Sequence, residues 1–221
     1  MPREAFVQDL QVLEQQVIEL GSMVDKAIAR SVEALGELDA EEARKIVHED
    51  LAINEKRFEI EEQALLLIAT QQPMASDLRA IAAVLYIIVD LERIGDHAEG
   101  IAKIVLMHGE ERLLKPLIDV PRMAEKSRSM IRTALDALIA RDAEAARRIA
   151  DEDDAVDALY DQVLRELFSY MIEDPRTITR ATYLMWVAHN LERIADRATN
   201  ICERVAFMVT GRMEEFNVSK Y

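Results

Sequence analysis

Two pairs of acidic side chains, each set four residues apart, are the feature of this sequence best suited to chemistry. Glu92 and Asp96 lie in LERIGDHAEGIA, and Glu192 and Asp196 lie a hundred residues later in LERIADRATNIC. On a helix this spacing puts both carboxylates on one face, where like charges cost about 0.2–0.5 kcal/mol per pair. A cation held between the two carboxylates relieves that repulsion, so the repeated pairs predict cation sites.

Further candidate ligands lie in the segments that precede these motifs. Asp153 and Asp157 are again four residues apart, and Asp50 is followed at the same distance by Asn54. Hard divalent or trivalent cations take several carboxylate oxygens, which neighbouring helices of a bundle can supply together. The predicted metal ligands are Glu92, Asp96, Glu192, Asp196, Asp50, Asn54, Asp153 and Asp157.

The identity of the metal stays open. Ligation by oxygen alone favours Mg²⁺, Mn²⁺, Ca²⁺ or iron over a structural zinc site, and iron, manganese, magnesium and zinc all remain candidates. The competing interpretation is a solvated acidic face whose charge is offset locally by Arg93 or Arg193. Either interpretation places the pairs on a polar face beside the core stripe formed by Leu91, Ile94, Ala98, Ile101, Ala102 and Val105.

The sequence contains no recognisable catalytic motif. It lacks a P-loop, G-x-S-x-G, H-E-x-x-H and G-x-G-x-x-G. None of its four histidines follows a glutamate by three residues, so the Glu-x-x-His pattern of di-iron bundles is missing as well. We predict that the protein is not an enzyme and has no catalytic or cofactor-binding residues apart from the acidic faces.

Composition narrows the class of protein further. Half of the 221 residues are hydrophobic, which is enough to bury a core, and the net charge of −15 disfavours nucleic acid and anionic lipid as partners. The single cysteine, Cys202, allows no internal disulfide and fits a reducing compartment. The longest apolar run, residues 80–89, is too short to span a bilayer. These features predict a cytoplasmic protein that meets the membrane only through its partners.

Apolar positions recur every three or four residues through six segments, which predicts six long helices and no sheet. The breaks between the segments fall at 36–39, 71–73, 114–121, 141–142 and 174–175, where Gly, Pro or a capping Asp occurs. Asp39 and Asp142 are the expected N-caps of two of these helices. The fold class is therefore all-α.

The order of these segments repeats within the chain. DAEEAR at 39–44 matches DAEAAR at 142–147, and seven of fourteen positions agree between 90–103 and 190–203. This duplication predicts two tandem three-helix bundles, residues 1–115 and 116–221. If Ile53 and Ile60 are exposed they indicate a homodimer, although a second apolar stripe could equally be covered within the chain.

The two motif copies, with DLRAI at 77–81, resemble the paired signature of the PhoU family of phosphate-specific transport system accessory proteins. The resemblance covers essentially the whole chain. It implies a negative regulator of the phosphate-starvation (Pho) regulon and of phosphate uptake. Its partners would be the ATPase subunit of a phosphate ABC transporter and a sensor histidine kinase.

The resemblance also implies multinuclear metal clusters on the acidic faces. Carried over by position, the motif falls on Glu92 with Asp96 and on Glu192 with Asp196, while the middle-helix positions fall on Asp50 with Asn54 and Asp153 with Asp157. This chain departs from the pattern at Asn54, where an acid is expected, and at Arg197, where the first copy has His97. The leading hypothesis is a phosphate-signalling adaptor. The alternatives are a bundle for metal storage or homeostasis and an inert helical scaffold.

Overall fold

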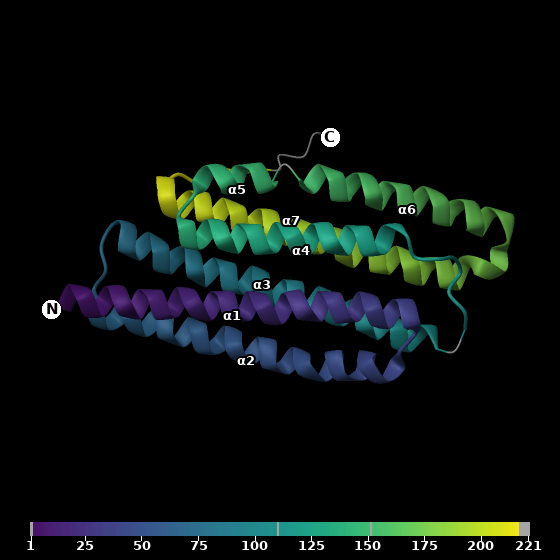
Figure 1. The fold of residues 1–221 in the computed structure, drawn as a ribbon, viewed down its shortest axis with the longest axis horizontal. Helices are drawn as coiled ribbons and strands as arrows, with labels where there is room; N and C mark the ends of the chain where they lie inside the picture. Colours follow the sequence, from purple (N-terminus) through teal and green to yellow (C-terminus); the bar gives the residue numbers. More distant parts are fainter. Residues whose placement is uncertain (1, 110, 151, 217–221) are drawn as a thin grey trace.

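The computed structural model describes residues 2–109, 111–150 and 152–216, and throughout these ranges every regular element is a helix. The long helices lie side by side in an elongated bundle (Figure 1). They are α1 (Pro2–Glu37), α2 (Ala40–Gln71), α3 (Ser76–His108), α4 (Asp119–Ala140), α5 (Ala143–Ala150), α6 (Asp153–Glu173) and α7 (Ile178–Thr210), with a short 3-10 helix, η1 (Pro175–Thr177), before α7. The prediction of an all-α fold built from two three-helix units is confirmed.

The third helix of each unit forms the junction between the units. Helices α3 and α7 pack against each other along the centre, α1 and α2 pack on α3, and α4, α5 and α6 pack on α7. Helix α1 also contacts α4, whereas α2 and α6 lie at opposite edges of the bundle (Figure 1). The polar faces of α3 and α7 are therefore each bordered by the middle helix of their own unit.

The predicted capping residues occupy the ends of the helices. The Asp39 side chain accepts hydrogen bonds from the backbone N–H groups of Glu41 (2.9 Å) and Glu42 (3.0 Å) at the start of α2. Asp142 accepts one from the N–H of Ala145 (2.9 Å) at the start of α5. These bonds satisfy donors that a helix leaves free in its first turn, which explains why the helices begin where they do.

The structure differs from the six-helix prediction in one respect, because the middle helix of the second unit is in two pieces. Helix α5 ends at Ala150 and α6 begins at Asp153, with Glu152 in a turn. This segment is rich in alanine and contains neither glycine nor proline, so intrinsic propensity favoured a continuous helix. In the first unit, α2 runs without interruption through the equivalent positions.

The core follows the stripe predicted for α3. Leu91, Ile94 and Ile101 are fully buried, as are Ala98 and Ala102. Ile53 and Ile60, which would indicate a homodimer if exposed, are also buried, since α2 turns them toward α3. The apolar stripe they belong to is covered within the chain, so these two residues supply no dimer interface.

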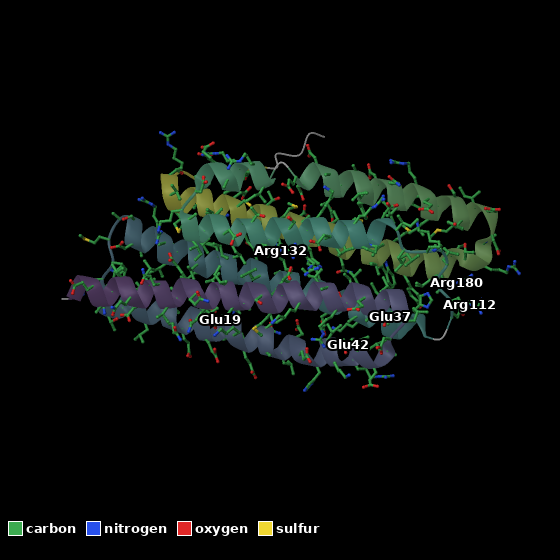
Figure 2. The ribbon with its side chains drawn as sticks, in the orientation of Figure 1. Glu19, Glu37, Glu42, Arg112, Arg132 and Arg180 are labelled. Carbon is green, nitrogen blue, oxygen red and sulfur yellow. The ribbon has the colours of Figure 1, made fainter. Side chains whose placement is uncertain are left out.

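A second contact between the units joins α1 to α4. Gly21 lies so close to Leu135 that a methyl group at position 21 would collide with the leucine side chain. Beside it, Arg128 of α4 forms a two-pronged ion pair with Asp25 of α1, at 2.9 and 2.8 Å. Arg132, one turn further along α4, joins the same carboxylate at 3.3 Å (Figure 2). No helix in the described ranges is long and apolar enough to cross a membrane.

Candidate functional site

The first acidic face is built by α2 and α3. Asp50 of α2 is 9% exposed and lies over Gly95, where an added Cβ would be 3.4 Å from its Oδ1. The pKa of Asp50 is raised to about 6, first by burial and then by the negative charges of Glu99, Asp96 and Glu92, whereas Lys103 lowers it. The structure thus brings Asp50 into the field of the predicted pair on α3.

Asn54 belongs to the same face. Its side-chain amide donates a hydrogen bond to Asp50 Oδ2 at 3.2 Å. Because an amide donor lies where the family pattern has an acid, this position supports the Asp50 carboxylate and adds no negative charge to it. The first face therefore combines one supported, buried carboxylate with the half-exposed pair on α3.

The second acidic face is built by α6 and α7. The pKa of Glu192 is raised to about 7, first by burial and then by the charges of Asp196 and Asp157, while Arg193 lowers it. The pKa of Asp157 is itself raised by burial and then by Asp196, Asp154 and Asp161. The predicted pair on α7 and Asp157 therefore share one electrostatic environment.

Asp153 is placed differently from the other predicted ligands. It is 1% exposed at the start of α6, and its charge contributes to the raised pKa of the buried Cys202 thiol, after the larger effects of burial and Glu203. The structure brings Asp157 to the acidic face but turns Asp153 toward the core of the second unit. The spacing of four residues predicts a shared helical face for the two acids, but at the first residue of α6 the Asp153 side chain is buried, whereas Asp157 is exposed.

Arginines of the same motif offset part of the charge. Arg93 lies 3.1 Å from Asp96 and 3.7 Å from Glu92, between the nearest charged atoms. Arg193 repeats this arrangement, at 3.0 Å from Asp196 and 3.6 Å from Glu192. Half-exposed pairs of this kind each contribute about 0–1 kcal/mol, so they soften the repulsion but leave the raised pKa values described above.

In the present side-chain conformations, the two acidic faces do not form a preformed metal site. Throughout residues 2–109, 111–150 and 152–216, no three His, Cys, Asp or Glu side chains are grouped closely enough to hold one ion. Carboxylate oxygens are the type of ligand that hard cations prefer. Their arrangement here does not fit a preformed cluster, because Arg93 and Arg193 occupy the space beside each pair.

One residue of the first face was missed as a candidate. Glu99 is the largest charged contributor to the raised pKa of Asp50, and its own carboxylate pairs with Lys103 at 2.6 Å. The signal was present in the sequence, since Glu99 lies three residues after Asp96 and seven after Glu92 on the same helical face. Its counterpart in the second copy is Thr199, so the acid at position 99 does not belong to the repeated pattern of acids.

Side chains adjacent to the two acidic pairs cross between the units. Arg197 Nη1 donates to Asp90 Oδ1 at 3.3 Å, and Asn200 Nδ2 donates to the same oxygen at 3.3 Å. In the other half of the junction, His97 Nδ1 lies 3.0 Å from Asn190 Oδ1. The internal repeat relates these two contacts, because Asp90 corresponds to Asn190 and Arg197 corresponds to His97. Arg197 directly follows Asp196 in the sequence, but in the structure its guanidinium points across the junction to Asp90.

The starts of α3 and α7 reach the opposite unit in a similar way. Arg79 Nε donates to the Met208 carbonyl at 3.5 Å in the last turn of α7. Arg180 Nη1 donates to the Arg112 carbonyl at 3.4 Å, just beyond α3, and the two residues lie together at one end of the bundle (Figure 2). The ends of the two central helices, α3 and α7, are therefore tied together at both extremities of the molecule.

Comparison with known proteins places this architecture in a family. The family model for the PhoU domain matches the chain twice, at residues 17–105 and 120–205. The phosphate-specific transport system accessory protein PhoU homolog of Clostridium acetobutylicum is 38% identical over 218 residues, covering 98% of this chain and all of the relative. The homolog of Rhizobium meliloti is 38% identical over 208 residues, covering 94% of this chain and 88% of the relative.

Two solved structures share the fold. The crystal structure of PhoU from Pseudomonas aeruginosa matches with a TM-score of 0.88 at 35% identity, covering 94% of this chain and all of that one. That of the phosphate transport system regulatory protein PhoU from Streptococcus pneumoniae matches with a TM-score of 0.88 at 34% identity, covering 95% and 99%. Similarity in sequence and in fold therefore extends over nearly the whole chain.

Proposed function

This chain belongs to the PhoU family, and on that premise we propose that it is a phosphate-signalling adaptor of the cytoplasm without catalytic activity. In high phosphate it represses the phosphate-starvation (Pho) regulon and restrains phosphate uptake. It does so by linking the ATPase subunit of the phosphate ABC transporter to a sensor histidine kinase. The observation that carries the proposal is the nearly full-length match to relatives named phosphate-specific transport system accessory proteins.

Two features of the chain are consistent with an adaptor. The two acidic faces lie on equivalent positions of one rigid bundle, and a net charge of −15 suits partners that present basic patches. The surrounding surface carries exposed aromatic side chains at equivalent positions of α3 and α7, namely Tyr86 and Trp186. Exposed aromatic residues next to charged ones are typical of protein interfaces.

Deleting the gene is the direct test. In high phosphate, the deletion strain is expected to express phosphate-starvation genes and to take up labelled phosphate faster than its parent. The intact chain supplied on a plasmid is expected to reverse both effects and to co-purify with the kinase or the transporter ATPase. Unchanged gene expression together with unchanged uptake would contradict the proposal.

The second candidate function is metal storage or homeostasis, with iron, manganese, magnesium or zinc as the ion. It is favoured by the raised pKa values of Asp50, about 6, and Glu192, about 7, because a bound cation relieves the repulsion that contributes to both. Calorimetric titration of the metal-free chain, beside a variant with Glu92, Asp96, Glu192 and Asp196 all changed to Ala, separates the two functions. A store loads many ions per chain, whereas an adaptor binds few or none.

We also propose that the chain forms a homodimer through the outer face of α2. Leu51, Phe58 and Leu65 recur there every seven residues and are 58%, 57% and 53% exposed. Apolar side chains at this spacing are typical of a helix that pairs with a second helix. Light scattering is expected to give twice the chain mass for the parent and the mass of one chain for Phe58→Glu. A single-chain mass for the parent would rule the dimer out.

A further inference from the structure

The chain that follows α7 folds back along that helix and ties it to α5. Gly211 ends α7 with a φ of 74°, a conformation that glycine adopts without strain and that reverses the direction of the backbone. Residues 211–216, called the C-terminal segment below, then contact α5 and α7 at several points. This segment is neither helix nor strand, so these contacts fix its position.

Three contacts hold the C-terminal segment. The guanidinium of Arg147 in α5 donates to Glu214 Oε2 at 3.2 and 2.8 Å. The backbone N–H of Phe216 donates to Glu203 Oε1 of α7 at 3.0 Å, and the Phe216 ring packs against the core. Arg204 Nη1 reaches Met213 Sδ at 3.4 Å. The segment therefore bridges from α5 to the last two turns of α7.

Helix α5 depends on such external support more than any other helix. It has eight residues, whereas an isolated helix in water needs roughly 12–15 to be even marginally stable. Its buried side chains, Ala143, Ala146 and Ile149, are small or few. The Arg147–Glu214 ion pair is about one-third exposed at both ends, and ion pairs of this kind are individually weak and sensitive to salt. The Arg147–Glu214 ion pair therefore supports α5, but breaking it costs little free energy.

In the described part of the first unit, the equivalent positions make different contacts. Arg44, the counterpart of Arg147, donates to the carbonyl of Ala40 in its own helix at 3.4 Å. Lys103, the counterpart of Glu203, pairs with Glu99 on α3. Helix α2 is 32 residues long, and its first turn is tied to α1, not to a segment after α3, by the ion pair of Arg30 with Glu42 at 2.6 Å. The contact between the C-terminal segment and α5 therefore occurs in the same unit as the helix that is divided into α5 and α6.

We propose that the C-terminal segment is a releasable latch that holds α5 against α7 and thereby sets the position of α6. The start of α6 follows α5 closely, and Asp157 in its second turn lies in the field of Asp196 and affects Glu192. When the latch is closed, the second acidic face has the form described above. When it is released, α5 and the start of α6 become free to move, while the first acidic face stays fixed.

Hydrogen exchange on the full-length chain tests the latch. In Arg147→Glu, the amides of residues 143–150 and the first turn of α6 are expected to exchange about three- to fivefold faster than in the parent. Arg147→Glu with Glu214→Arg, which restores the pair with its charges exchanged, is expected to return these rates toward those of the parent. Exchange in residues 40–50 of α2 should not change in either variant.

Arg148→Glu is the matched control. It makes the same charge change on an exposed neighbour in α5 that does not contact the C-terminal segment in the described part of the chain. Unchanged exchange in Arg147→Glu would overturn the proposal. So would equal acceleration in Arg148→Glu, or failure of the exchanged pair to slow the rates, because either result would trace the effect to helix propensity or net charge.

Discussion

Replacing Arg197 by methionine is expected to lower the free energy of unfolding at pH 8 by about 2–3 kcal/mol. Within the described part of the chain, Arg197 forms the one direct ion pair of the Asp90 carboxylate, which is 13% exposed, while Arg204 acts on it from farther away. Burial raises the pKa of Asp90, while bonds from Asn200 and Arg197 lower it. Methionine keeps much of the packing volume but leaves the carboxylate in the junction with one amide donor.

The sign of the pH dependence follows from the same group. Without Arg197 the pKa of Asp90 in the folded protein rises further, so the folded state then binds a proton more tightly than the unfolded state does. The loss of stability is therefore full above the raised pKa and shrinks as the carboxyl becomes protonated at lower pH. Urea unfolding at pH 8 and at pH 5 measures both values.

His97→Leu is the matched control, because it breaks the equivalent contact in the other half of the junction. Burial lowers the pKa of His97, so its bond to Asn190 joins two neutral groups at pH 8. Losing a neutral bond of this kind costs about 0.5–1.5 kcal/mol. Asp90→Asn in the Arg197→Met background removes the stranded charge and is expected to recover at least half of the loss. Equal costs for Arg197→Met and His97→Leu would contradict the interpretation.

Sequence reasoning identified the features that local interactions determine. The caps at Asp39 and Asp142, the ends of the helices and the buried stripe of α3 all follow from residues close together in the chain. The duplication could be recognised because both copies conserve the same short motif. Together these features fixed the all-α fold and placed the acidic pairs beside the core.

The features it missed are those that depend on which helices meet. Periodicity shows that position 197 lies near the core, but it cannot show that the guanidinium crosses to Asp90 on another helix. The division between α5 and α6 was equally hidden, because an alanine-rich segment without glycine or proline favours one continuous helix. Asp153 was predicted as a ligand because it lies four residues before Asp157, and that spacing cannot show that the first residue of α6 is buried.

The second large expected effect is on how the free energy of unfolding depends on pH, and it arises from the acidic faces. Glu192→Gln is expected to raise the free energy of unfolding at pH 8 by about 1–3 kcal/mol. The folded-state pKa of about 7 exceeds the ordinary value of 4.5, first through burial and then through Asp196. The folded protein thus binds the proton more tightly than the unfolded chain, and its stability falls as the pH rises from about 4 to about 7. At pH 4 the variant and its parent should unfold at nearly the same temperature.

Asp50→Asn is expected to behave in the same way over a lower window, because its folded-state pKa is about 6 and its ordinary value is 3.8. An asparagine oxygen there can still accept the bond from Asn54. The measurement is the difference between variant and parent. The pKa values of His97, His108 and His189 are lowered, which affects the parent in the opposite sense and cancels in the difference for Asp50→Asn. In Glu192→Gln the contribution of His189 does not cancel, because His189 Nδ1 lies 3.5 Å from Glu192 Oε2.

The two faces belong to different helix pairs, so the effects of Glu192→Gln and Asp50→Asn should add in the double variant. Glu33→Gln, which removes an exposed carboxylate of α1, is the control for net charge. A difference that does not vary with pH would mean that Arg93 and Arg193 already relieve the repulsion. If a divalent cation binds these faces, adding it should reverse the order of stability at pH 8, because it then stabilises the parent and not the variant. That reversal would show that the repeated acidic pairs are maintained to bind a positive charge from outside the chain.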